Sequence, residues 1–250
     1  MASAAVVPPP APAPLSEAQR IAYTFFAPGK TFTDLRRSAS WWAPFLLIVI
    51  VSLAFSYVVD QKVGFRKVVD NLIELQPKQA ERLEALPPDQ REKNLALQVT
   101  ITKAISFGFP LIALALYFVY SAVLFATLKF GASADIQYTK MFALVVYTRL
   151  PELLRALLAI LSMLAGVSTD GFNIQNPLAT NPGYFIDPSG SAVLRALLSP
   201  LDVITIWSLV LTAIGISCIS KVKRGTAFAV VFGWYVIIVI GRVAITAATS

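Results

Sequence analysis

Five long apolar stretches dominate this sequence and limit the folds open to it. Each has close to the roughly 20 residues that a helix needs to cross about 30 Å of bilayer hydrocarbon. Backbone groups in lipid must be hydrogen-bonded within the protein, which favours helices over irregular chain. The sequence therefore predicts an all-α fold, an integral membrane bundle of five transmembrane helices. The expected spans are residues 41–59, 104–128, 139–167, 201–219 and 226–248.

The composition agrees with a membrane protein and excludes several kinds of chemistry. Hydrophobic residues make up 56% of the chain and charged residues only 14%, whereas soluble domains are about one quarter charged. There is no histidine, which removes the usual general base and the commonest metal ligand. The single cysteine, Cys218, cannot form a disulfide within the chain. We therefore expect no catalytic residue, no metal and no cofactor, and an intramembrane enzyme is the weakest hypothesis.

The net charge of +7 comes from basic residues scattered between the spans. Such residues suit loops that touch anionic lipid. They are not clustered with aromatic residues, as a nucleic-acid surface would require. We expect membrane lipids as partners, and no nucleic acid.

The N-terminal region divides into a tail and a membrane domain. Residues 1–15 are rich in proline and alanine and lack charged side chains, so we expect a disordered tail. The domain then covers residues 16–250. It opens with a capping box at Ser16 and Gln19 and a short amphipathic helix that would lie along the membrane surface. The expected apolar face of this helix consists of Ala18, Ile21, Ala22, Phe25 and Phe26.

Residues 25–32, FFAPGKTF, contain a GKT sequence like the end of a phosphate-binding loop. A P-loop needs a glycine five residues earlier, after a buried strand. Thr24 occupies that position, and no strand-like segment precedes it. We therefore expect no nucleotide, and a solvated linker just outside the first span.

Two longer loops carry apolar residues that predict further packing. In the polar loop 60–103, helical spacing predicts an amphipathic helix with one apolar and one polar face. The apolar face consists of Phe65, Val68, Val69, Leu72 and Ile73, and the polar face of Arg66, Lys67, Asp70, Asn71 and Glu74. Prolines at 77, 87 and 88 divide this loop into shorter pieces. The loop between spans three and four is expected to fold onto the bundle, because it retains Phe172, Ile174, Tyr184, Phe185 and Ile186.

Special residues within the spans predict bends and close packing. Pro110 and Pro151 should bend spans two and three, since proline lacks the backbone donor. Small residues four apart let helices approach closely. In span five, the small residues Gly225, Ala229, Gly233 and Gly241 share one face. The favoured interpretation is packing against span four at Ala213 and Ser217, and the alternative is a dimer seam.

Ionisable residues inside the apolar stretches are the candidate site. Arg149, Glu152 and Arg155 lie in span three at spacings that share one side of a helix. Arg242 lies in span five, at the expected depth of Asp202, and we predict an ion pair between them unless Arg242 extends to the headgroups. One interpretation of the set is a lipid or solute site with basic walls, and the other is a structural ion-pair network.

Orientation follows from the basic residues of the loops, which are enriched on the cytoplasmic side. The N-terminal flank and the loops 129–140 and 220–225 together carry nine, but the long loop 60–103 carries eight. The short loops favour a cytoplasmic N-terminus.

Several patches of the sequence, in order, resemble the Yip family of multispanning membrane proteins, named for interaction with Ypt/Rab GTPases. The first is FFAPGKTF followed by WWAPF, at the start of the first span. The second is FGASADIQYTKMFALVVYTRLP, with Tyr147 before a Leu-Pro pair. The third is SPLDVITIWSLVLTAIGI followed by SKVKRGTAFAVVFGWYVI. Together they cover roughly residues 24–245, and the short segment before the first span resembles the bacterial branch.

The resemblance implies five spans, a cytoplasmic N-terminus, an external C-terminus and a location in the bacterial inner (plasma) membrane. It also implies a non-enzymatic membrane-organising or adaptor protein that binds lipids, other membrane proteins or a second copy of itself. The alternative is a small channel, carrier or lipid-handling protein that uses Arg149, Glu152, Arg155 and Arg242. A cavity that reaches these four residues would favour the alternative.

Overall fold

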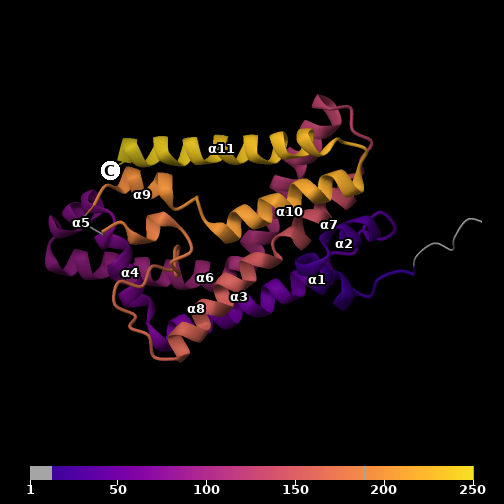
Figure 1. Ribbon diagram of the computed structural model, residues 1–250. Helices are drawn as coiled ribbons and strands as arrows, with labels where there is room; N and C mark the ends of the chain where they lie inside the picture. Colours follow the sequence, from indigo (N-terminus) through magenta and orange to yellow (C-terminus); the bar gives the residue numbers. More distant parts are fainter. Residues whose placement is uncertain (1–12, 188–189, 250) are drawn as a thin grey trace, which may run out of the picture.

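The computed structural model describes residues 13–187 and 190–249, and every regular element in that part of the chain is a helix (Figure 1). The all-α prediction is confirmed. The predicted disordered tail lies outside the described residues except for 13–15, which have no regular structure. In chain order the helices are α1 (Glu17–Phe26), α2 (Pro28–Asp34), α3 (Trp42–Lys62), α4 (Phe65–Glu74), α5 (Pro77–Glu84), α6 (Pro88–Ala126), the π-helical η1 (Thr127–Gly131), α7 (Tyr138–Thr148), α8 (Leu150–Leu164), the 3₁₀ turn η2 (Pro182–Phe185), α9 (Ala192–Leu198), α10 (Val203–Ile219) and α11 (Arg224–Thr249).

Three of the described helices are long and apolar enough to cross a membrane: α3, α6 with its extension η1, and α11. The chain bends by 42° between α9 and α10, and a fourth crossing results if these two helices form one bent span. The predicted count of five spans is therefore not confirmed. At 1.5 Å per residue, the 39 residues of α6 extend about 58 Å, well beyond the hydrocarbon. The second span is thus the continuation of a helix that begins in the polar loop.

The predicted third span, 139–167, is two helices rather than one. Helix α7 ends at Thr148 and α8 begins at Leu150, with Arg149 between them. Pro151 has no N–H to donate back to α7, but proline is well tolerated in the first turn of a new helix. Pro110, by contrast, lies inside α6, which continues past it.

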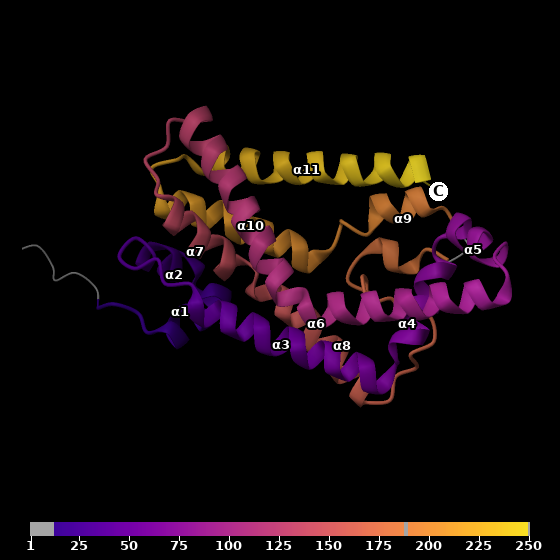
Figure 2. The ribbon, with the colours of Figure 1, turned by 180° about the vertical axis from the view of Figure 1, so that it is seen from behind.

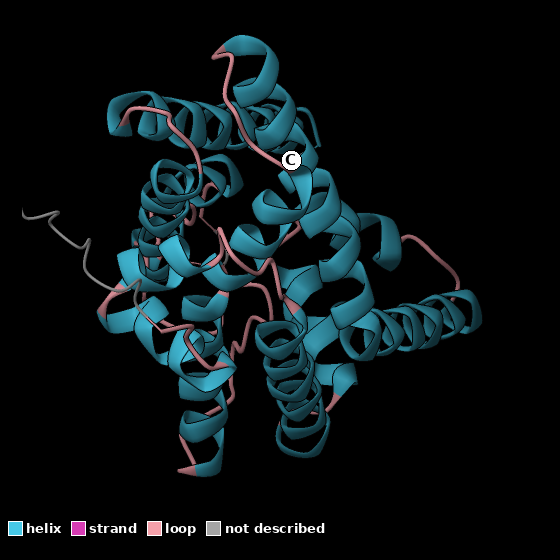
Figure 3. Cartoon of the chain, turned by 90° about the vertical axis from the view of Figure 1, so that its right-hand side faces the viewer, coloured by secondary structure: helices cyan, strands magenta, loops and turns pink. Residues whose placement is uncertain are grey.

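Helix α7 is the centre of the bundle. All eight residues from 141 to 148 are buried, and α7 packs against α3, α6 and α10. A helix that is apolar on every side is stable only when it is surrounded by protein or lipid. Figure 2, which views the molecule from behind, shows α7 beside α10 and α6, and Figure 3, which views it from one end, shows helices joined by loops.

Helices α1 and α2 form a packed hairpin instead of the linker expected at residues 25–32. Phe32 and Leu35 are fully buried, and α2 packs against α10. Pro28 opens α2, where a missing N–H costs nothing. The prediction of a solvated linker is wrong, because Phe32 is part of the core and Phe25 packs against it.

The N-terminal cap of α1 forms as the sequence predicts, but the side of the helix that packs against the bundle differs from the prediction. The capping box is present: the Ser16 hydroxyl accepts from the Gln19 N–H, and the Gln19 side chain accepts from the Ser16 N–H. Buried polar residues, Arg20 and Thr24, face the bundle together with Ile21 and Phe25. Residues expected on the same apolar face, Ala18, Ala22 and Phe26, are exposed instead. The polar side faces inward because Arg20 has a buried partner.

The amphipathic helix predicted in the polar loop is confirmed as α4. Phe65, Val68 and Val69 are buried, and Leu72 and Ile73 pack against neighbouring clusters. Of the predicted polar face, Asn71 is the exception. It is buried, and its amide donates to the Phe172 carbonyl oxygen at 2.9 Å.

The loop after α8 folds onto the bundle in part, as predicted. Phe172 and Ile174 pack against the cluster of α3, α4 and α8, while Tyr184 and Phe185 are 47% and 74% exposed. The turn η2 sits directly on the end of α9. A Cβ built on Gly183 would lie 2.5 Å from the Ser199 backbone nitrogen, so only glycine fits here.

The small-residue face of α11 does not pack against α10. Positions 225, 229, 233 and 241 are exposed, and a Cβ built on Gly225, Gly233 or Gly241 would meet nothing within 4 Å. The side of α11 that faces the bundle carries the buried residues Ala227 and Val231. The predicted contact of the small face with Ala213 and Ser217 is therefore wrong. Bulky residues on the side of α11 that faces the bundle, such as Phe228 and Tyr235, pack against the core instead.

Candidate functional site

Asp202 is the residue from which the candidate site is built. It occupies the N-cap of α10, where its Oδ1 accepts from the N–H groups of Ile204 at 3.0 Å and Thr205 at 2.9 Å. Aspartate is well suited to this position because the first N–H groups of a helix lack partners. Only 3% of Asp202 is exposed, so its charge needs a partner inside the protein.

That partner is Arg155 of α8. Its Nη2 donates to Asp202 Oδ1 at 2.5 Å and to the Thr205 hydroxyl at 3.0 Å. Its Nη1 lies 3.0 Å from Glu152 Oε2, one turn earlier in α8. The second carboxylate oxygen of Asp202 accepts from the loop, through the Thr180 hydroxyl and the Asn181 amide. Asp202 thus joins α8, α10 and the preceding loop. We use the name Asp202 junction for Asp202 and its network of Glu152, Arg155, Thr180, Asn181 and Thr205.

The predicted ion pair between Asp202 and Arg242 is not found. The break between α9 and α10 turns Asp202 toward α8 and the loop, while α9 packs along α11. The carboxylate is therefore occupied by Arg155 and by the loop. Among the described residues, Arg242 forms no ion pair.

Arg149 is separate from the junction. It lies at the break between α7 and α8, and its guanidinium carbon is 4.9 Å from the centre of the Tyr120 ring. This is a cation–π geometry, which stabilises a cation that is partly removed from water. The predicted set of charges is thus divided in three: Glu152 and Arg155 at the junction, Arg149 over Tyr120, and Arg242 on α11.

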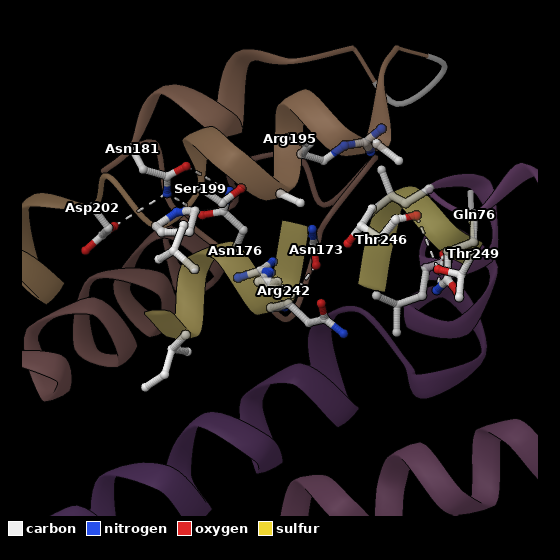
Figure 4. A pocket seen from close by; sticks show the side chains of 18 of the residues that line it. Gln76, Asn173, Asn176, Asn181, Arg195, Ser199, Asp202, Arg242, Thr246 and Thr249 are labelled. Atoms are coloured by element: carbon white, nitrogen blue, oxygen red, sulfur yellow. Dashed lines mark hydrogen bonds between the residues drawn. The ribbon is translucent and has the colours of Figure 1, made fainter. Parts of the chain in front are cut away.

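Arg242 lines a cavity of about 640 Å³ next to the junction (Figure 4). The cavity lies between the second half of α11, helices α5 and α9, and the loop after α8. Its lining is strongly basic, since Asp202 is its one acidic side chain among the described residues. The five basic side chains that line it are Lys78, Arg82, Arg155, Arg195 and Arg242. We call this space the basic cavity.

Sequence reasoning missed three of these basic residues, Lys78, Arg82 and Arg195. They lie on short helices in polar loops, where a basic residue is ordinarily solvated. The sequence offered one indication: the loops that carry these residues were expected on the same side of the membrane as the C-terminal end of span five. That indication does not show which loops fold toward α11.

The loop that borders the basic cavity is also fastened to α4. Lys67 Nζ lies 2.5 Å from Asp170 Oδ1. The hydrogen bond from Lys67, followed by that from Ser168, holds the pKa of Asp170 below its ordinary value. This side chain is 86% exposed, so the contact adds orientation more than stability.

A second buried ion pair was not anticipated, and it lies at the N-terminal hairpin. Arg20 Nη2 is 2.7 Å from Asp34 Oδ2, and both side chains are about 5% exposed. Burial lowers the pKa of Arg20, but the hydrogen bond and charge of Asp34 more than offset this, so the pKa lies above its ordinary value. The Tyr147 hydroxyl, at the centre of the bundle, donates to Glu17 at 2.9 Å. These bonds fix α1 and α2 to the core.

Within residues 13–187 and 190–249, no three acidic, cysteine or histidine side chains lie together as a metal site requires.

Comparison with known protein families identifies the chain. The profile described as the Yip1 domain matches residues 22–245. The chain belongs to the Yip1 family. The match runs from α1 almost to the end of α11, so it includes the Asp202 junction and every lining residue of the basic cavity except Thr246 and Thr249. It confirms the resemblance in the sequence. Comparisons with curated proteins and with solved structures give no match. Together with the long apolar helices, Yip1 membership indicates an integral membrane protein.

Proposed function

We propose that this Yip1-family protein is a non-enzymatic membrane-organising or adaptor protein that binds lipids and other membrane proteins. The observation that supports it best is the outward face of α11. Only 6% of its most apolar segment is buried within the chain. Val236, Ile237 and Ile240 are 52%, 58% and 62% exposed. A face this apolar must be covered by lipid or by another protein.

The interior of the bundle supports a scaffold more than a catalyst. Several of its buried polar groups bind one another, such as Arg20 with Asp34, and the Thr212 hydroxyl with that of Thr148 at 3.0 Å. The acid at the junction, Asp202, is engaged by an arginine and by backbone N–H groups. Groups held in this way give rigidity, and none is left free to exchange a proton with a substrate.

For location and orientation we propose the bacterial inner membrane, with the N-terminus in the cytoplasm and the C-terminus outside. The partner on the α11 face is a lipid, another membrane protein or a second copy of the chain. The small-residue face at Gly225, Ala229 and Gly233 suits a helix partner, since these three positions are exposed among the described residues.

Extraction of the protein from native membranes in polymer-bounded discs, with co-purifying proteins and lipids identified, tests the proposal. We expect specific proteins or lipids to be enriched over an unrelated membrane protein of similar size. Gly233→Leu, which projects into open space from the small-residue face, should remove a protein partner without unfolding the chain. Ala115→Leu, at an exposed position of α6 and therefore away from the small-residue face, is the control. Equal contents for the wild type and the unrelated protein would contradict the adaptor role.

A lipid-handling or carrier role is the second candidate, because one observation favours it. The basic cavity reaches two of the four intramembrane charges, Arg155 and Arg242, and does not reach Arg149 or Glu152. Transfer of a labelled lipid or release of a trapped solute from proteoliposomes would test this role. Rates equal to those of empty liposomes would exclude it.

A further inference from the structure

We propose that the basic cavity binds the phosphate-bearing headgroup of an anionic phospholipid. The proposal rests on the second candidate function, and it names the ligand class for that cavity. At about 640 Å³ the cavity is within the range of roughly 300–1,000 Å³ typical of small-molecule sites. Five basic residues on four separate helices converge on it.

The charges of the cavity select an anion. Its acidic residue, Asp202, already binds Arg155, Thr205 and the loop. Among the described residues, Lys78 and Arg82 of α5 and Arg242 of α11 form no ion pair, although they line the same space. Like charges that face one space repel each other, and an anion bound between them removes the repulsion. Arginine forks match the oxygens of a phosphate, and lysine adds a point charge.

The polar neighbours of these cations suit a phosphate ester. Gln76, Asn173 and Asn176 also line the cavity, and Figure 4 shows them around the same space as Arg242. Amide side chains both donate and accept hydrogen bonds. They can therefore bind the hydroxyl groups of a headgroup as well as its phosphate oxygens.

The position of Arg242 favours a lipid over a soluble anion. Arg242 is about 27 Å along α11 from Arg224 at 1.5 Å per residue, close to one edge of the hydrocarbon. That edge is the level of lipid headgroups. One turn earlier, Ile238 also lines the cavity and is 55% exposed. A headgroup in the cavity would therefore leave its acyl chains along the apolar face of α11, a contact that a free phosphate cannot make.

Native mass spectrometry of the detergent-purified protein tests the site, with phosphatidylglycerol and phosphatidylcholine as probes. We expect phosphatidylglycerol to bind at least about tenfold more tightly, because the basic lining repels the choline cation that phosphatidylcholine carries beside its phosphate. Competition with inorganic phosphate and with glycerol phosphate distinguishes the sources of the anion. Millimolar inorganic phosphate that displaces the lipid completely would show a site for a soluble anion and overturn the lipid assignment.

The decisive variant is the triple change Lys78→Gln, Arg82→Gln and Arg242→Gln. It removes three cations without touching the Asp202 junction, and we expect it to abolish the preference for phosphatidylglycerol. The matched control is Lys62→Gln, Arg91→Gln and Lys93→Gln. These exposed cations lie on α3 and α6, outside the cavity, and should leave the preference intact. Equal losses in both triple variants would show attraction to basic surface in general and overturn the proposal.

A variant that fills the cavity separates volume from charge. Val239→Trp keeps every cation but places an indole where Val239 lines the cavity, and we expect tenfold or greater loss of the lipid. Unchanged binding would mean that the lipid is elsewhere. Headgroup binding without lipid transfer in proteoliposomes would exclude the lipid-handling role and still establish this site. Failure of the second candidate function is therefore distinguishable from failure of the headgroup site.

Discussion

Asp202 combines three tasks that separate residues ordinarily perform. It caps α10, neutralises Arg155 and holds the loop through Thr180. The sequence identified this residue as one half of an ion pair but assigned the wrong partner. Depth in the membrane was the only geometric information available, and depth does not determine the direction in which a helix end faces.

Replacement of Asp202 should therefore be costly. In Asp202→Ala, the Arg155 guanidinium, which is 23% exposed, loses one of its two carboxylate partners and keeps Glu152, and α10 loses its cap. We expect about 2–4 kcal/mol of destabilisation, a value reduced from that of a fully buried pair because Arg155 retains some solvent. Thermal unfolding in one detergent, followed by fluorescence, measures it.

A double-mutant cycle shows which arginine is the partner. Asp202→Ala and Arg155→Ala should couple strongly, whereas Asp202→Ala and Arg242→Ala should add. Strong coupling to Arg242 would mean that the pair first predicted from the sequence is the one that forms.

At the scale of helices, the fold depends on where glycine permits close approach. Gly215 of α10 faces α7, and a Cβ built on it would lie 2.1 Å from Leu144 Cδ1. Leu144 is fully buried and cannot move without displacing the core. Gly233 of α11 has no neighbour within 4 Å of such a Cβ. The two glycines share a residue type but not a role.

Alanine at these two positions should have opposite effects. Gly215→Ala should destabilise the bundle by about 1–3 kcal/mol through overpacking against α7. Gly233→Ala should leave stability unchanged or raise it by up to about 1 kcal/mol, because alanine has the higher helix propensity. Unfolding temperatures of the two variants in the same detergent give the comparison. If Gly215→Ala is neutral, α7 and α10 do not pack as closely as described.

The N-terminal hairpin gives a second prediction at this scale. Asp34→Ala leaves Arg20 as a buried cation without its principal partner, so α1 should separate from the bundle more often. Hydrogen exchange followed by mass spectrometry should show faster exchange in α1 and α2 than in the wild type, with α7 unchanged. Glu81→Ala, which removes an exposed carboxylate from α5, is the control and should not alter exchange in α1. Equal exchange in the wild type and Asp34→Ala would show that apolar packing alone holds the hairpin.

Over the whole molecule, local patterns were predictable and long-range choices were not. The apolar runs gave α3, α6 and α11, and helical spacing gave the buried face of α4, because both signals belong to a single segment. The break at Arg149 could not be distinguished from a proline bend, since apolar residues continue on both sides of it. Two features depend on contacts between distant segments: the exposure of the side of α11 that carries Gly233, and the assembly of the basic cavity. Pattern reasoning within one segment carries no information about those contacts.

The location of each end of the bundle gives the last prediction. The N-terminal hairpin and the α10–α11 hinge lie at one end (Figure 1), where Arg36 donates to the Cys218 carbonyl oxygen at 2.5 Å. The loop after α8 and the C-terminal end of α11 lie at the other end, beside the basic cavity. If the N-terminus is cytoplasmic, the cavity opens at the outer surface.

Single cysteines in a Cys218→Ala background measure this orientation in intact cells. Ser38→Cys and Lys221→Cys, both at exposed positions, should be protected from an impermeant thiol reagent until the membrane is opened. Ala179→Cys, exposed at the opposite end, should react at once. Labelling of Ser38→Cys but not Ala179→Cys in intact cells would invert the topology and place the basic cavity at the cytoplasmic leaflet. Labelling of Ser38→Cys and protection of Lys221→Cys would be more serious, because the contact between Arg36 and the end of α10 requires both on the same side.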